Sequence, residues 1–169
     1  VADDGSTKET LSMLSNIEGS LNYELKHVWH DDIGFRAAAI RNKAVAASAG
    51  GYLIFLDGDC VPFPSFVHRH MMLKEYGWFV RGNRTMLSKS FTQIILKEGL
   101  PIHRYSKFTW IKQRFMKNIK RVLPLMHVPV SWYRKNKPED WFGVKTCNLG
   151  VWREDFEVVN GFDEHYIGW

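Results

Sequence analysis

The stretch YLIFLDGDCVP, residues 52–62, places two carboxylates, Asp57 and Asp59, directly after five apolar residues. A nearly continuous apolar run of this length is typical of a strand covered on both faces of a parallel sheet. Asp-Gly after such a run is also a strong hairpin signal. The next segment, residues 62–76, has a helical pattern instead of a second strand, which weakens the hairpin interpretation. Residues two apart in an extended chain point the same way, so both carboxylates can face one ligand.

Helical and extended patterns alternate on both sides of this stretch. Ser6 and Glu9 form a capping box that predicts the start of the first helix. Alternating helices and buried strands imply an α/β layered domain. We expect the tail of a strand at residues 1–2, helices over 6–19, 35–48 and 64–76, and strands over 22–29, 52–56 and 78–81.

Composition and cysteine usage restrict the class of protein. With 169 residues, of which 45% are hydrophobic, the chain is expected to form a single folded domain. No apolar run approaches the ~20 residues of a membrane span, and no signal peptide is recognisable. Cys60 and Cys147 are a widely separated pair without Cys-x-x-Cys spacing. This usage favours a reduced cytoplasmic protein over a disulfide scaffold or a zinc site.

The positive charge is concentrated in residues 99–138, which hold ten Lys or Arg and no acid. This basic insert could meet phosphate, nucleic acid or an anionic membrane, or be a solvated face. Its aromatic residues alternate with basic ones, as in single-stranded nucleic-acid grooves. Residues 111, 115, 119 and 122 also form one apolar stripe of a predicted basic helix, which could lie on anionic lipid or pack in the core.

The position of the acids suggests a ligand site. In open α/β sheets ligands bind at the carboxyl ends of the strands, where Asp57 and Asp59 are expected. Asp3 and Asp4 follow another predicted strand end. Two acidic strand ends at one crevice would repel each other without a cation or hydrogen-bond donors between them. A hard divalent ion, held by carboxylates and substrate phosphates, fits this arrangement.

Three kinds of site compete for the Asp-Gly-Asp motif. An EF-hand loop is excluded, because its fifth and sixth positions would be Val61 and Pro62. A haloacid-dehalogenase phosphatase would use Asp57 as nucleophile and Asp59 as acid. That motif normally follows the first strand of its domain, whereas here about 50 residues of strand and helix pattern precede it. The third possibility is the Asp-x-Asp motif of nucleotide-sugar transferases.

Three separated motifs decide among these alternatives. ADDGSTKET at 2–10, FRAAAIRNKAVAASAGGYLIFLDGDC at 35–60 and NLGVWREDFEVVNGFDEHYIGW at 148–169 together resemble the family 2 glycosyltransferases with the GT-A fold. The last is also similar to the Asn-Gly-Phe…Gly-Trp region of β-1,4-galactosyltransferases and bacterial capsule and lipopolysaccharide transferases. The resemblance implies a mostly parallel central sheet flanked by helices. It also implies inverting, metal-assisted transfer of a sugar from a nucleoside diphosphate to a glycan or lipid-linked acceptor.

The resemblance assigns donor-binding roles to the first two motifs. Asp3 and Asp4 match the acidic pair that holds the nucleoside, with Asp4 for the base, and Ser6 belongs to the same motif. Arg41 matches the arginine of the helix that lines the diphosphate; the alternative is a cation on the helix surface. UDP is the expected nucleotide.

The resemblance also assigns the metal and the acceptor side. Asp57, Gly58 and Asp59 match the metal motif, with Asp59 as the direct ligand of Mn²⁺ or Mg²⁺. Trp169 matches a tryptophan that forms a wall against sugar, and Asn160 lies in the loop leading to it.

The sequence departs from the family pattern at both ends. The family has a strand before Asp-Asp-Gly-Ser, and after Gly-Trp a Gly-x-Glu-Asp whose carboxylate is the general base. We therefore expect an internal piece of a larger enzyme with no catalytic base of its own, although Asp163, Glu164 and His165 are titratable neighbours. We further expect a cytoplasmic location, peripheral contact with the inner face of the membrane through residues 104–121, and no nucleic-acid partner.

Overall fold

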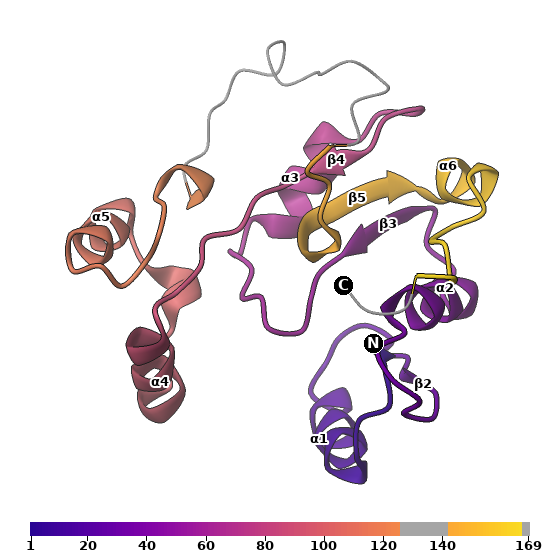
Figure 1. Ribbon diagram of the computed structural model, residues 1–169, viewed down its shortest axis with the longest axis horizontal. Coiled ribbons are helices and arrows are strands. Elements are labelled where there is room, and N and C mark those ends of the chain that lie inside the picture. The colour runs from indigo at the N-terminus through magenta and orange to yellow at the C-terminus, as the bar shows by residue number, and fades with distance from the viewer. Residues whose placement is uncertain (126–141, 167–169) are drawn as a thin grey trace. The chain divides into compact units, whose positions relative to one another are not determined.

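The computed structural model describes residues 1–125 and 142–166. The chain divides into two compact units, Val1–Leu53 with Arg153–Trp169, and Ile54–Trp152. Helices and strands occur in both units, as Figure 1 shows, and the predicted α/β class is confirmed. Within the described residues, no helix is both long enough and apolar enough to cross a membrane.

The first unit is built on a pair of short parallel strands. Strand β1 (Ala2–Asp3) pairs with β2 (Val28–Trp29), with Ala2 opposite Val28. Helix α2 (Ala37–Ala47) packs against both strands. Helices α1 (Lys8–Glu18) and α6 (Arg153–Val158) complete the unit. Its buried apolar side chains include Leu14, Ala39, Ile40, Val45 and Phe156.

Helix α2 forms because its sequence, AAAIRNKAVAA, is rich in the strongest helix former. The last carbonyls of a helix have no partner within it. Here the guanidinium of Arg153 supplies one, since it donates to the carbonyl oxygens of Val45 at 3.2 Å and Ser48 at 3.0 Å. Arg153 Nε also donates to the carbonyl of Gly50 at 2.9 Å. One side chain from α6 therefore holds the end of α2 and the turn before the next strand.

The second unit contains a three-stranded sheet in the order β3-β5-β4. Strand β3 (Tyr52–Phe55) runs across the boundary between the units, and β5 (Leu149–Trp152) pairs antiparallel with β4 (Val80–Arg81). The helices of this unit are α3 (Phe66–Leu73), α4 (Lys89–Glu98) and α5 (Lys107–Phe115). Short 3-10 helices span Ile102–Arg104, Leu123–Leu125 and Thr146–Asn148.

Helices α4 and α5 share a small apolar core made by Phe91, Ile102, Trp110 and Ile119. Both helices begin at serine N-caps: the hydroxyl of Ser88 accepts from the backbone N–H of Phe91, and that of Ser106 from Thr109. Helix α4 ends at Gly99 in the left-handed conformation, with φ of 62°. These local signals explain why two short helices have defined ends.

The predicted start of the first helix and the predicted strand over 22–29 need correction. Helix α1 begins at Lys8 with Thr7 as the N-cap, so the capping box at Ser6 is wrong. The N–H of Ser6 instead donates to the Asp3 carboxylate at 2.8 Å, which holds Ser6 in the turn after β1. Only Val28 and Trp29 of the second segment pair as a strand.

The predicted apolar stripe over 111, 115, 119 and 122 is also wrong as a single helix face. Helix α5 ends at Phe115, and Lys117 adopts a left-handed φ of 60° that turns the chain away. Ile119 then joins the core at 2% exposure and bridges to Leu87, whereas Phe115 remains 83% exposed. Residues 119 and 122 of the stripe therefore pack in the core, whereas residues 111 and 115 do not.

Candidate functional site

The turn after β1 brings Asp3 and Asp4 to the carboxyl end of the parallel strand pair. Gly5 lies between this turn and the loop at Asp32, with φ of 90°. A Cβ at Gly5 would lie 2.6 Å from the Cα of Asp32, so only glycine fits this close approach. The two acidic residues are therefore held on a tight backbone turn against the loop that follows β2.

Asp3 is an interior carboxylate, only 5% exposed. Its Oδ1 accepts from the backbone N–H of Ser6 at 2.8 Å, and its Oδ2 lies 2.7 Å from Nε2 of His27. Burial by itself raises the pKa of Asp3, but hydrogen bonds from Ser6 and His27 outweigh it and leave that pKa below its ordinary value. Asp3 is thus an ionised group that fixes the turn.

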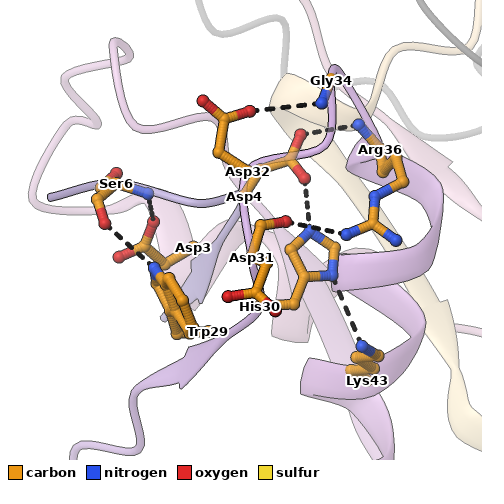
Figure 2. Close-up of polar contacts among 10 residues, drawn as sticks. All are labelled: Asp3, Asp4, Ser6, Trp29, His30, Asp31, Asp32, Gly34, Arg36 and Lys43. Atoms are coloured by element: carbon orange, nitrogen blue, oxygen red, sulfur yellow. Dashed lines mark hydrogen bonds and ion pairs between the residues drawn. The ribbon is translucent and has the colours of Figure 1, made fainter.

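Asp4 has a different environment, shown in Figure 2. Its Oδ1 lies 2.5 Å from Nε2 of His30, and its Oδ2 accepts from the backbone N–H of Arg36 at 2.8 Å. The other ring nitrogen of His30 lies 3.5 Å from Nζ of Lys43. Because a carboxylate only accepts, Nε2 of His30 donates its hydrogen to Asp4.

The Asp4 side chain is 22% exposed, against 3% for Asp3. A carboxylate has about four lone-pair positions, and the contacts from His30 and Arg36 use two of them. Asp4 therefore combines a fixed orientation with capacity to accept further hydrogen bonds from a ligand. Of these two neighbouring acids, Asp3 is therefore structural and Asp4 is accessible to a ligand.

The side chains that surround this acidic pair were not predicted from the sequence. His27 and His30 flank the short strand β2, and Lys43 comes from α2. Trp29, half-exposed, donates from Nε1 to the carbonyl of Ser6 at 3.0 Å, which holds its ring beside the turn (Figure 2). The two histidines on either side of β2 are the only sequence signal that could have indicated this surround. Lys43 gives no such signal, because it reaches the site through the packing of α2 on the strands.

Arg41 and Asn160 belong to the same unit as the acidic pair. Arg41 lies on α2, partly buried, and its neighbour Asn42 binds the backbone of Phe162. Asn160 lies in the turn that ends α6, in the left-handed conformation with φ of 59°. Trp169, the predicted sugar wall, lies outside the described residues.

Asp57 and Asp59 follow β3 in the second unit, as the sequence predicted. The N–H of Cys60 donates to the carbonyl of Asp57 at 3.0 Å, so residues 57–60 form a turn. Asp57 Oδ2 lies 3.6 Å from the guanidinium of Arg84, a residue that sequence analysis did not single out. Asp59 is exposed, as is Gly58 between the two acids.

Cys60 modifies the chemistry of this turn. Burial raises the pKa of its thiol to about 11, assisted by its hydrogen bond to Asp59 and by the charge of that carboxylate. Cys60 is therefore a neutral thiol at physiological pH, with its Sγ 3.5 Å from Asp59 Oδ1. The oxygen ligands that this turn offers are the carboxylates of Asp57 and Asp59.

The two carboxylates of this turn, Asp57 and Asp59, are suitable ligands for a hard divalent cation. No group of three or more His, Cys, Asp or Glu side chains suited to a metal occurs in residues 1–125 and 142–166. Mg²⁺ is commonly held by one or two carboxylates, with the remaining positions filled by phosphate oxygens and water. Asp57 and Asp59 match that mode of binding.

A separate open depression of about 330 Å³ lies in the second unit. Two of the residues that line it, Arg81 and Lys145, are cationic, and none is acidic. Such a lining suits an anionic ligand. The remaining lining residues are Gly82, Asn83, Phe142 and Gly143.

Comparison with known proteins gives one family and a small set of relatives. Residues 1–140 match the model of glycosyl transferase family 2. Validoxylamine A glucosyltransferases of Streptomyces hygroscopicus subsp. jinggangensis and subsp. limoneus are each 26% identical over the whole chain. This chain covers 40% and 37% of those two proteins. Chondroitin synthase of Escherichia coli is 36% identical over 43% of this chain and 10% of its own length.

Proposed function

Because this chain belongs to glycosyl transferase family 2, we propose that it binds a nucleoside-diphosphate sugar and serves transfer of the sugar to a glycan or lipid-linked acceptor. The observation that carries the proposal is the Asp4 carboxylate, which is oriented by His30 and Arg36 and still accessible at the end of β1. The matched relatives are named as a glucosyltransferase and a chondroitin synthase, which supports a sugar as the transferred group. The phosphatase and nucleic-acid alternatives receive no support from these relatives.

In this proposal Asp4 recognises the base of the donor. A carboxylate accepts hydrogen bonds only, so it selects a base edge that presents N–H groups, as the N3–H of uracil does. Uracil, thymine and guanine all present such a group, and UDP is the nucleotide that we propose. Asp3 and Ser6 support Asp4 by fixing the turn, and Arg41 on α2 is the proposed cation for the diphosphate.

Asp57 and Asp59 are the residues that would hold Mn²⁺ or Mg²⁺, with exposed Asp59 as the direct ligand. A bound divalent cation supplies positive charge that offsets the charge developing on the leaving diphosphate. Arg84, 3.6 Å from Asp57, places a second positive charge beside the same carboxylate. This contact orients the Asp57 side chain in the turn.

The remaining elements of the proposal concern the acceptor. We assign Asn160 and Trp169 to the acceptor side and an inverting course to the transfer, as in the family pattern. The proposed location is cytoplasmic, at the inner face of the membrane, with contact through residues 104–121. A lipid-linked acceptor would then be presented at the surface that the enzyme touches.

Thermal unfolding of the full-length enzyme with UDP, GDP, CMP or dTDP, each with and without Mn²⁺, tests the donor site. A ligand of the native state raises the unfolding temperature by mass action, so UDP with Mn²⁺ is expected to give the largest increase. Asp4→Asn should remove most of the preference for UDP over the other nucleotides. Equal, metal-independent shifts for all four nucleotides in the wild-type enzyme would contradict the proposal.

A further inference from the structure

Helix α5 exposes large apolar side chains on one face. Phe108 is 84% exposed, Phe115 83% and Ile111 40%. These positions are spaced i, i+3 and i+7, so at about 100° per residue they lie on one strip of the helix. Trp110 projects on the opposite side and is buried, 5% exposed. Trp110 packs in the core on that inner side, whereas Phe108, Ile111 and Phe115 form an outer strip of exposed apolar side chains.

Cationic side chains border this outer strip on both sides. By the same helical spacing, Lys112 lies along one edge, and Lys107 and Arg114 lie along the other. All three are exposed. The chain that follows α5 adds exposed Lys117, Lys120 and Arg121, and no acidic residue occurs between Gly99 and Leu125.

An apolar strip between two rows of cations matches the chemistry of one kind of partner. Helices that lie in the interface of a bilayer bury an apolar face among the acyl chains, while their Lys and Arg meet the phosphates of anionic lipids. A second copy of this helix is a poor partner, because pairing two outer strips would bring like charges together. Single-stranded nucleic acid binds in grooves, whereas this strip lies on the outside of a helix.

We propose that the outer strip of α5 docks on an anionic lipid bilayer, with Phe108 and Phe115 inserted among the lipid headgroups and the flanking cations on their phosphates. The inference rests on the membrane contact in the proposed function and gives it a defined insertion face. It also differs from a purely electrostatic contact, because two phenylalanines add binding that salt does not screen.

Co-sedimentation of the full-length enzyme with phosphatidylcholine vesicles, with and without phosphatidylglycerol, tests the docking face. Phe108→Gln with Phe115→Gln should reduce partitioning onto anionic vesicles by about tenfold or more, and the loss should persist at high salt. Lys112→Gln with Arg114→Gln and Lys117→Gln should remove the preference for anionic over neutral vesicles. The matched control, Tyr23→Gln with Val158→Gln, removes two exposed apolar side chains from the first unit and should bind like wild type.

Thermal shift with UDP and Mn²⁺ separates this inference from the donor site. All the variants should retain the nucleotide shift and an unchanged unfolding temperature, because every substituted side chain is exposed. A wild-type enzyme with the nucleotide shift but no vesicle binding would overturn the docking face alone. Vesicle binding without a nucleotide shift would overturn the donor site alone. A wild-type dimer that the phenylalanine variant dissociates, or salt-sensitive RNA binding that replaces vesicle binding, would also overturn the docking face.

Discussion

The side-chain amide of Asn42 pairs with both backbone groups of Phe162. Its Nδ2 donates to the Phe162 carbonyl at 2.8 Å, and its Oδ1 accepts from the Phe162 N–H at 3.0 Å. Nδ2 also donates to Glu164 Oε1 at 2.8 Å. Gly161 permits this approach, since a Cβ there would lie 2.7 Å from Asn42 Oδ1. One side chain of α2 thus holds the segment after α6 as a neighbouring strand would.

Asn42→Asp should destabilise this unit. The variant keeps the acceptor for Phe162 N–H but turns a carboxylate oxygen toward the Phe162 carbonyl and Glu164. Loss of the partly buried Nδ2 donor and the added repulsion should lower the free energy of unfolding by about 1–3 kcal/mol, measured by urea denaturation. Asn16→Asp on the exposed face of α1 is the matched control and should change little. Equal effects of the two variants would contradict the role of Asn42.

His70 should make stability depend on pH below about 6.5, its ordinary pKa. Its Nε2 donates to Asn148 Oδ1 at 2.9 Å, and its buried Nδ1 has no hydrogen-bond partner among the described residues. Burial lowers the pKa of His70, although the bond to Asn148 acts in the opposite direction. The unfolded chain therefore binds the proton first, and stability falls as pH decreases through this range.

His70→Gln tests this dependence, because glutamine retains a donor for Asn148 but does not titrate. Unfolding temperatures of both proteins between pH 7.5 and 5 should converge as the pH falls, since only the wild type loses the His70 contribution. His27 and His30 are present in both proteins and cancel in the comparison. Parallel pH profiles would contradict the assignment.

Asp59→Asn should remove the effect of Mn²⁺ on UDP binding by the full-length enzyme. Removing a residue that hydrogen-bonds to a metal ligand typically lowers metal affinity by about 10–100-fold. Removing the ligand itself should therefore lower it at least as much. Isothermal titration with UDP in the presence and absence of Mn²⁺ measures the difference. Glu98→Gln, which removes an exposed charge at the end of α4, should retain it. Retained Mn²⁺ dependence in Asp59→Asn would exclude this turn as the metal site.

His30→Ala should weaken binding of the preferred nucleotide by about tenfold, because Asp4 loses the N–H that orients its carboxylate. Binding of pyrophosphate with Mn²⁺ should not change, since pyrophosphate has no base for Asp4 to recognise. His30→Gln, which restores a donor, should recover part of the affinity. His165→Ala removes a 99% exposed side chain and serves as the control. Equal losses for UDP and pyrophosphate would indicate a general structural effect of His30.

The sequence predicted best where neighbouring residues decide the conformation. The Ala-rich segment around Arg41 forms α2, and the apolar run before Asp57 forms β3, each within two residues of its predicted bounds at either end. Prediction failed where the chain makes a turn or a core contact that competes with the expected helix pattern. Ser6 gives its N–H to Asp3, and Lys117 turns the chain so that Ile119 reaches the core shared by α4 and α5.

The sequence by itself determined the α/β class, the family resemblance and the acidic motifs, because these depend on residue order and local periodicity. Only the tertiary structure decided what each acid does. Asp3 and Asp4 are adjacent in the chain, yet burial with Ser6 and His27 makes one of them structural, while His30 and Arg36 orient the other toward solvent. Ser6 is a near neighbour of Asp3, but His27, His30 and Arg36 lie 24, 26 and 32 residues away from the acids that they bind. No local pattern encodes such contacts, since they exist only after α2 has packed on the paired strands.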